Sequence, residues 1–153
     1  MEKQSKELNI FLIEDDSIDI MVFKRALKQL DVAHKLTIFT NGEEFLQYYD
    51  DNSLSDKKNV SLYGPDIMFV DLNTPRMSGI DLLKVMIDKR DRLFFPIIVL
   101  STSAEENDIS NAYKYFVNGY ITKSISFNTF VENLKIVIKY WDTVQVPKGI
   151  NND

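Results

Sequence analysis

Short apolar runs alternate with amphipathic segments along the chain. Three of the runs are nearly continuous blocks of Ile, Val, Leu and Phe, which is typical of strands buried on both faces of a parallel sheet. Two shorter runs complete a set of five predicted strands, at residues 8–13, 35–39, 67–70, 97–100 and 120–122.

Each predicted strand is followed by a segment with apolar residues at helical spacing. These segments span residues 18–30, 45–49, 80–87, 109–116 and 127–141. The alternating order predicts an α/β fold with one doubly wound, five-stranded parallel sheet, right-handed crossovers and helices on both faces. Polar residues stand where helix N-caps are expected, namely Asp16 or Ser17, Thr40 or Asn41, Ser78, Ser103 and Ser126.

The length of 153 residues suits a single domain. We expect one domain over residues 1–153, with its core at 7–141 and a C-terminal tail at 142–153. The interior segment 50–64 is rich in Asp, Asn, Ser and Lys, and it is predicted to be a long exposed loop that does not divide the domain.

Composition removes several classes of function. With 18 Lys and Arg against 23 Asp and Glu the net charge is −5, so general attraction to nucleic acid or to an anionic membrane is not expected. No apolar run is long enough for a membrane span or a signal-peptide core, which predicts a cytoplasmic protein. The absence of cysteine and the single histidine exclude disulfides, thiolate metal sites and two-histidine metal sites.

Chemically reactive side chains gather at the ends of the predicted strands. Glu14 and Asp15 follow the first strand, Asp71 the third, Ser101 the fourth and Lys123 the fifth. In an open parallel sheet the ligand site lies beyond the carboxyl ends of the strands, so these side chains are expected to meet. Clustered carboxylates repel one another unless a proton or a cation compensates, and carboxylates with a backbone carbonyl and water suit Mg²⁺. An aspartate beside that ion is a nucleophile for phosphorus, and the amine and hydroxyl would offset the charge of the phosphoryl oxygens.

Each of these residues also has a purely structural interpretation. Acidic residues after a strand can cap the next helix, and Asp16 fits that role best. Asp71 suits a turn, Ser101 a helix entry and Lys123 a solvated surface. Their joint position at four strand ends favours the chemical interpretation.

At these positions the sequence resembles the receiver domains of two-component response regulators over nearly its whole length. The residues that carry the resemblance are Glu14 and Asp15 as the acidic pair, Asp71 within Phe-Val-Asp-Leu-Asn-Thr-Pro-Arg-Met-Ser-Gly as the phosphoacceptor, Ser101 as the hydroxyl residue and Lys123 as the lysine. The resemblance implies a flavodoxin-like strand order of 2-1-3-4-5. It also implies a signalling phosphoacceptor that catalyses only its own phosphorylation and slow dephosphorylation, with a sensor histidine kinase or a phosphotransfer protein as the donor.

The resemblance further assigns a metal site and a switch. Mg²⁺ would be held by Glu14 or Asp15, by Asp71, by the backbone carbonyl of Asn73 and by water. Tyr120 would turn inward as Ser101 is drawn toward the phosphoryl group, which changes the surface of the fourth helix, fifth strand and fifth helix.

The sequence departs from the family pattern at three places. Ser124 stands where a proline after a cis bond is usual, and we predict a trans Lys123–Ser124 bond. Thr102 is larger than the usual Ala or Gly and is expected to narrow phosphoryl access. Asn73 and Ser103 stand where residues tune the lifetime of the phosphoryl group.

The tail, the 50–64 segment and the Ser-Thr-Ser run at 101–103 are similar to single-domain regulators associated with bacterial phytochromes. This similarity implies a photoreceptor kinase as partner and a homodimer packed through the last helix, where Tyr140 and Trp141 would contribute. Alternatively, Trp141 closes the core of one chain.

Two other functions remain open. A haloacid-dehalogenase-like phosphatase also uses a strand-end aspartate and Mg²⁺, but it requires a second Asp two residues later, where this chain has Asn73. A receiver-like interaction module that is never phosphorylated is the other alternative.

Overall fold

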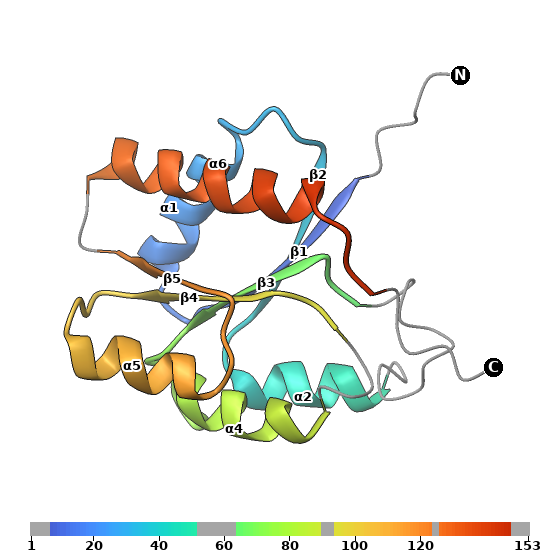
Figure 1. The fold of residues 1–153 in the computed structure, drawn as a ribbon, viewed down its shortest axis with the longest axis vertical. Coiled ribbons are helices and arrows are strands. Elements are labelled where there is room, and N and C mark those ends of the chain that lie inside the picture. Colours follow the sequence, from blue (N-terminus) through green and yellow to red (C-terminus); the bar gives the residue numbers. More distant parts are fainter. Residues whose placement is uncertain (1–6, 52–63, 90–93, 124–125, 148–153) are drawn as a thin grey trace.

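Five parallel strands form one sheet in the order β2-β1-β3-β4-β5 in the computed structural model, which describes residues 7–51, 64–89, 94–123 and 126–147 (Figure 1). The strands are β1 (Leu8–Ile13), β2 (His34–Phe39), β3 (Ile67–Asp71), β4 (Ile97–Ser101) and β5 (Gly119–Thr122). The five predicted strands and the order 2-1-3-4-5 are therefore confirmed.

Helices cover both faces of the sheet, as predicted (Figure 1). They are α1 (Ser17–Leu27), α2 (Gly42–Asp51), α4 (Gly79–Lys89), α5 (Glu106–Lys114) and α6 (Phe127–Thr143). In Figure 1, α1 and α6 lie on one side of the sheet, and α2, α4 and α5 lie on the other. No helix in the described ranges is both long and apolar enough to cross a membrane.

The continuous apolar strands supply residues to both faces. In β1, Ile10 and Leu12 pack in the cluster under α1 and α6, whereas Phe11 and Ile13 pack in the cluster under α2 and α4. From Ile10 to Ile13 the strand is covered on both sides, which explains why this stretch of β1 is apolar at every position and lacks polar alternation.

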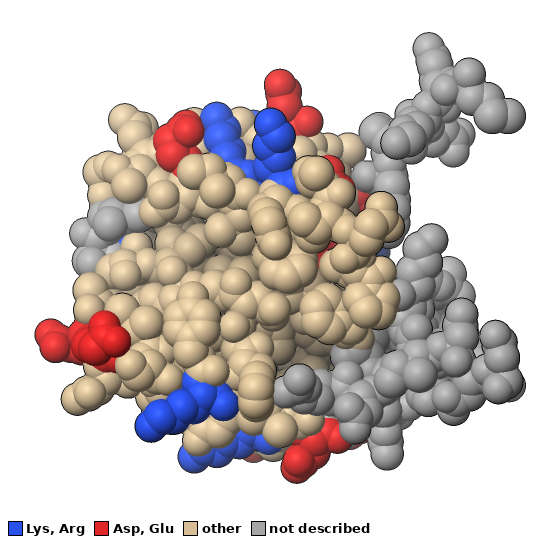
Figure 2. Space-filling view, in the orientation of Figure 1, with Lys and Arg blue, Asp and Glu red and all other residues tan. Residues whose placement is uncertain are grey.

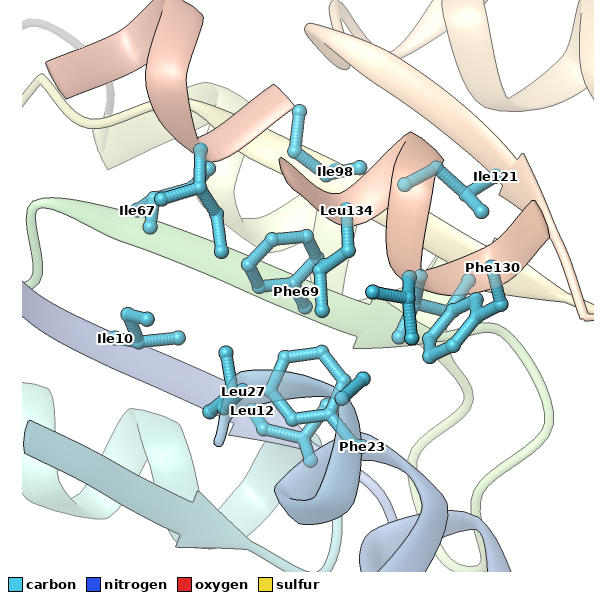
Figure 3. Packing of buried hydrophobic residues seen from close by; sticks show 14 of the residues in the cluster. Ile10, Leu12, Phe23, Leu27, Ile67, Phe69, Ile98, Ile121, Phe130 and Leu134 are labelled. Carbon is cyan, nitrogen blue, oxygen red and sulfur yellow. The ribbon is translucent and has the colours of Figure 1, made fainter. Parts of the chain in front are cut away.

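The core between the sheet and the α1–α6 pair is built around aromatic rings (Figure 3). Phe23 of α1 meets Phe69 of β3 edge to face, with ring centroids 5.1 Å apart. Phe130 and Leu134 of α6 lie in the same cluster (Figure 3). This packing holds α1 and α6 together beside the carboxyl ends of β1 and β5.

Four of the five expected N-cap positions are confirmed. Asp16, Asn41, Ser78 and Ser126 each accept a hydrogen bond from a backbone N–H in the first turn of the following helix. The prediction for Ser103 was wrong: α5 begins at Glu106, its N-cap residue is Glu105, and no side chain caps it.

The helix after β1 is also shorter than its apolar pattern, since α1 ends at Leu27 while the pattern runs to Leu30. Most of the predicted 50–64 loop and the Lys123–Ser124 bond lie outside the described residues.

Candidate functional site

The strand register brings the predicted site residues to one edge of the sheet. Ile13 of β1 pairs with Val70 of β3, so Glu14 and Asp71, which follow them, emerge side by side. On the other side of β3, Asp71 pairs with Leu100 of β4, which places Ser101 one residue beyond. Because parallel strands end at the same edge, these side chains share one rim.

The same register places Lys123 at this rim. Ser101 pairs with Thr122 of β5, and Lys123 follows with its backbone N–H donating to the carbonyl of Ser101 at 2.6 Å. The five residues from four strands that the sequence analysis singled out therefore converge.

The ammonium group of Lys123 lies among three carboxylates. Its Nζ is 2.6 Å from Glu14 Oε2, 3.0 Å from Asp71 Oδ2 and 3.0 Å from Asp19 Oδ2. Glu14 is 1 % exposed and Asp71 7 %, so two of these contacts are nearly free of solvent. A charge-assisted contact in such surroundings is stronger than the same pair on an open surface.

Glu14, Asp15 and Asp71 form a group with the chemistry of a metal site. One carboxylate oxygen from each residue lies within 4.8 Å of the others. Glu14 and Asp71 are buried while Asp15 is exposed, so the group opens to solvent on the Asp15 side. Hard oxygen donors around an opening that admits water suit a small divalent cation such as Mg²⁺. The residues present therefore fit the ion that the sequence implies.

Asn73 lies next to this group through its backbone. Its N–H donates to Asp71 Oδ1 at 3.0 Å, while its side chain is exposed. The bond fixes the turn that leaves β3 and the orientation of the Asp71 carboxylate.

The electrostatics of the rim reflect the excess of negative charge. Burial raises the pKa of Glu14 from 4.5 to about 7, and nearby Asp71 adds to the rise although the hydrogen bond from Lys123 opposes it. For Lys123, burial alone would lower the pKa, but hydrogen bonds to Glu14 and Asp19 and the charge of Asp71 raise it above 10.5. Lys123 therefore stays charged, and Glu14 becomes the group that takes up a proton in the metal-free site.

The predicted switch residues, Ser101 at the end of β4 and Tyr120 in β5, are both joined to the loop that follows β4. Ser101 is buried, and its hydroxyl oxygen accepts a hydrogen bond from the Ser103 N–H at 3.1 Å. The Tyr120 hydroxyl donates to the Ser103 carbonyl at 2.8 Å. Hydrogen bonds through Ser103 thus link Ser101 to Tyr120, whose ring is half-buried. The Thr102 side chain is exposed.

One contact of the site was not predicted from the sequence. Asp19 lies in the first turn of α1 and is not part of the apolar stripe of that helix. Its carboxylate contacts Lys123, which is 104 residues further along the chain. The strand-end rule misses it because it belongs to a helix. The available signal was a further acidic residue four positions after Asp15, on a helix that begins at the rim.

Comparison with known proteins agrees with this geometry. Residues 10–135 match the family described as "Response regulator receiver domain", so the chain belongs to this family. Response regulator Rcp1 of Synechocystis is 29% identical over 142 residues, which cover 90% of this chain and 92% of Rcp1. The similarity to phytochrome response regulators that the sequence suggested is confirmed by the solved structure of one such regulator, RcpA.

Solved structures show the same likeness. The crystal structure of the phosphorylated cyanobacterial phytochrome response regulator RcpA has a TM-score of 0.74 and 29% identity, and covers 92% of this chain and 98% of its own. The Mn²⁺-bound form of Rcp1 has a TM-score of 0.70 and 26% identity, and covers 92% and 99% of the two chains.

Proposed function

We propose that this response regulator accepts a phosphoryl group on Asp71 from a sensor histidine kinase or a phosphotransfer protein. The observation that carries the proposal is the meeting of three carboxylates within 4.8 Å with Lys123 3.0 Å from Asp71. An Asp71 oxygen attacks phosphorus, the P–N bond to the donor histidine breaks, and the released imidazole nitrogen takes up a proton.

The surrounding groups divide the work of charge stabilisation. Glu14, Asp15, Asp71 and the backbone carbonyl of Asn73 would hold Mg²⁺, which offsets the negative charge of the phosphoryl oxygens when it is bound. Binding of a divalent metal is supported by the relative whose crystal structure is an Mn²⁺-bound form. Lys123 and the Ser101 hydroxyl would donate to the remaining phosphoryl oxygens.

The proposed output is a change of surface rather than metabolite turnover. As Ser101 moves toward the phosphoryl group, the loop that carries Ser103 moves with it, and Tyr120 follows through its bond to the Ser103 carbonyl. The surface of α5, β5 and α6 would then change its affinity for a partner.

We further propose that the donor is a phytochrome-type photoreceptor kinase in the cytoplasm and that the chain forms a homodimer. The kinase assignment is supported by the likeness to RcpA and Rcp1. The homodimer is supported by exposed large apolar residues on α5, on the turn that follows it and on α6, namely Tyr113, Phe116, Ile136 and Tyr140. In the view that shows α5, β5 and α6, charged side chains lie mainly at the periphery and uncharged ones across the middle (Figure 2).

Trp141 takes part in both interpretations that the sequence left open. Its ring packs against the core cluster under α1 and α6, and it also meets the exposed Tyr140 edge to face at 5.1 Å.

Phosphorylation by a small donor tests the assignment of Asp71. The purified protein is incubated with Mg²⁺ and acetyl phosphate, and intact mass is recorded over time. We expect one added phosphoryl group in the wild type, none in Asp71→Asn, and normal uptake in the matched control Asp88→Asn, which removes an exposed carboxylate on α4. Uptake by Asp71→Asn at the wild-type rate would contradict the assignment.

The same assay separates the alternatives. A protein that takes up no phosphoryl group from any donor would be an unphosphorylated interaction module. Repeated turnover of a simple phosphate ester would favour the phosphatase, which the missing second aspartate at Asn73 argues against.

A further inference from the structure

Lys123 uses its three N–H bonds on three different carboxylates. Two of them, Glu14 and Asp71, belong to the group that suits a cation, and the third, Asp19, does not. Asp19 can therefore remain bound to the Lys123 amine when a cation occupies the other carboxylates.

The carboxylates of Glu14 and Asp71 cannot bind the Lys123 ammonium and a metal cation at full strength at the same time. In Glu14, Oε1 accepts from the Asp16 N–H and Oε2 from Lys123. In Asp71, Oδ1 accepts from the Asn73 N–H and Oδ2 from Lys123. Each of the four oxygens already accepts a hydrogen bond, and Lys123 holds one oxygen of each carboxylate, so a cation that binds there competes with the Lys123 ammonium for the same negative charge.

Asp19 is placed to receive the displaced amine. Its backbone N–H is held by Asp16 Oδ1 at 2.9 Å, which fixes the first turn of α1 beside Lys123. Both Asp19 and Lys123 line a cavity of about 330 Å³ between α1 and α6, so the amine has room to move toward Asp19. The Asp19 side chain is 41% exposed, whereas Glu14 and Asp71 are buried.

We propose that Asp19 is a positioning residue: it retains Lys123 when a divalent cation occupies the Glu14–Asp15–Asp71 group, and thereby strengthens cation binding without being a ligand. The inference rests on the proposed metal site. Without Asp19, every carboxylate partner of the amine in the described structure is one that the cation also needs.

Mn²⁺ binding measures this role directly. Free Mn²⁺ is counted by electron paramagnetic resonance during titration of the wild type and of three variants. We expect Asp19→Asn to weaken Mn²⁺ binding by about threefold to tenfold, as for other directly coupled charges. Asp19→Glu keeps the charge and should recover at least half of the loss on a logarithmic scale.

The matched control is Asp16→Asn. It removes the same charge three residues away, and Asn still caps α1, but Asp16 does not touch Lys123. We expect its affinity for Mn²⁺ to fall clearly less than that of Asp19→Asn, because the Asp16 carboxylate makes no contact with Lys123 and so cannot hold the amine. An equal loss in both variants would reduce the effect to general electrostatics and overturn the proposal.

A double-mutant cycle shows whether Asp19 acts through the amine. In the Lys123→Gln background, Asp19→Asn should change Mn²⁺ affinity by less than about twofold. The same factor in both backgrounds, or no effect of Asp19→Asn in the wild type, would overturn the positioning role while leaving the metal site intact. A wild type that binds no Mn²⁺ would overturn the metal site and this inference together. Circular dichroism spectra establish that the variants are folded.

Discussion

In the proposed metal site, Lys123 would stabilise the rim and at the same time compete with the bound cation. Its amine offsets the charge of Glu14 and Asp71, which are buried, and of Asp19, which is partly exposed. Two opposite effects should therefore follow when the positive charge is removed. The fold loses a partner for buried carboxylates, and a divalent cation loses its competitor.

We predict that Lys123→Gln lowers the unfolding free energy by about 3 kcal/mol in EDTA, the lower range for breaking a buried ion pair, since Asp19 is partly solvated. Mn²⁺ affinity should rise by about tenfold, because the oxygens of Glu14 and Asp71 are released from the amine. Urea denaturation and Mn²⁺ titration measure the two quantities. Lys135→Gln is the control, since its pair with Glu132 is exposed and is worth little. Weaker Mn²⁺ binding in Lys123→Gln would contradict the competition.

At the scale of elements, the junction between β3 and α4 sets the position of Asp71. The Gly79 N–H donates to the Leu72 carbonyl at 3.0 Å, so α4 begins directly against the backbone that leaves β3. A Cβ on Gly79 would lie 2.5 Å from the Asp71 carbonyl oxygen and 2.7 Å from Leu72 Cα. Backbone atoms of a central strand cannot yield as a side chain does, so this glycine is required for close packing.

Gly79→Ala should therefore affect both stability and chemistry. We expect the unfolding free energy to fall by about 3 kcal/mol, in the range for a severe steric conflict, and phosphorylation by acetyl phosphate to slow at least about tenfold because Asp71 is displaced. The control is Gly119→Ala, whose Cβ would meet only side-chain atoms of Ile98, the nearest at 3.1 Å. Its loss of stability should be smaller and its phosphorylation unchanged. Equal effects of the two substitutions would show that the junction does not position Asp71.

The elements were predictable where burial dominates the sequence pattern. Strands β1, β3 and β4 are covered on both faces, so their apolar runs are unambiguous, and the rim residues follow from where those runs end. Ser103 was misassigned because its hydroxyl has other partners: it accepts from the Glu105 N–H and donates to Asp108. Asp19 escaped notice because its contact depends on how α1 packs beside β5, which no local pattern encodes.

At the scale of the whole molecule, folding forces negative charges together. Glu14 and Asp15 lie more than 50 residues from Asp71 in the sequence, and the folded sheet brings oxygens of all three within 4.8 Å of one another. The unfolded chain keeps these groups apart and solvated. The stability of the fold is therefore linked both to protons and to divalent cations, which each relieve the repulsion.

This linkage predicts that stability falls with rising pH in the absence of metal and that Mg²⁺ offsets the fall. The pKa of Glu14 is about 7 in the folded protein and 4.5 in its ordinary state, so the folded form holds the extra proton between these values. In EDTA the unfolding free energy should consequently fall as pH rises from about 4.5 to 7, by at most about 3 kcal/mol from this group.

Mg²⁺ favours the deprotonated carboxylate. At a free Mg²⁺ concentration about 100 times the dissociation constant, the unfolding free energy should therefore rise by about 3 kcal/mol near pH 7 and by much less near pH 5. Urea denaturation across this range, with and without Mg²⁺, measures both effects, and Glu14→Gln removes the titrating group while keeping the side chain's size. If the wild type and Glu14→Gln lose stability in parallel in EDTA, Glu14 is not the group through which the rim senses protons.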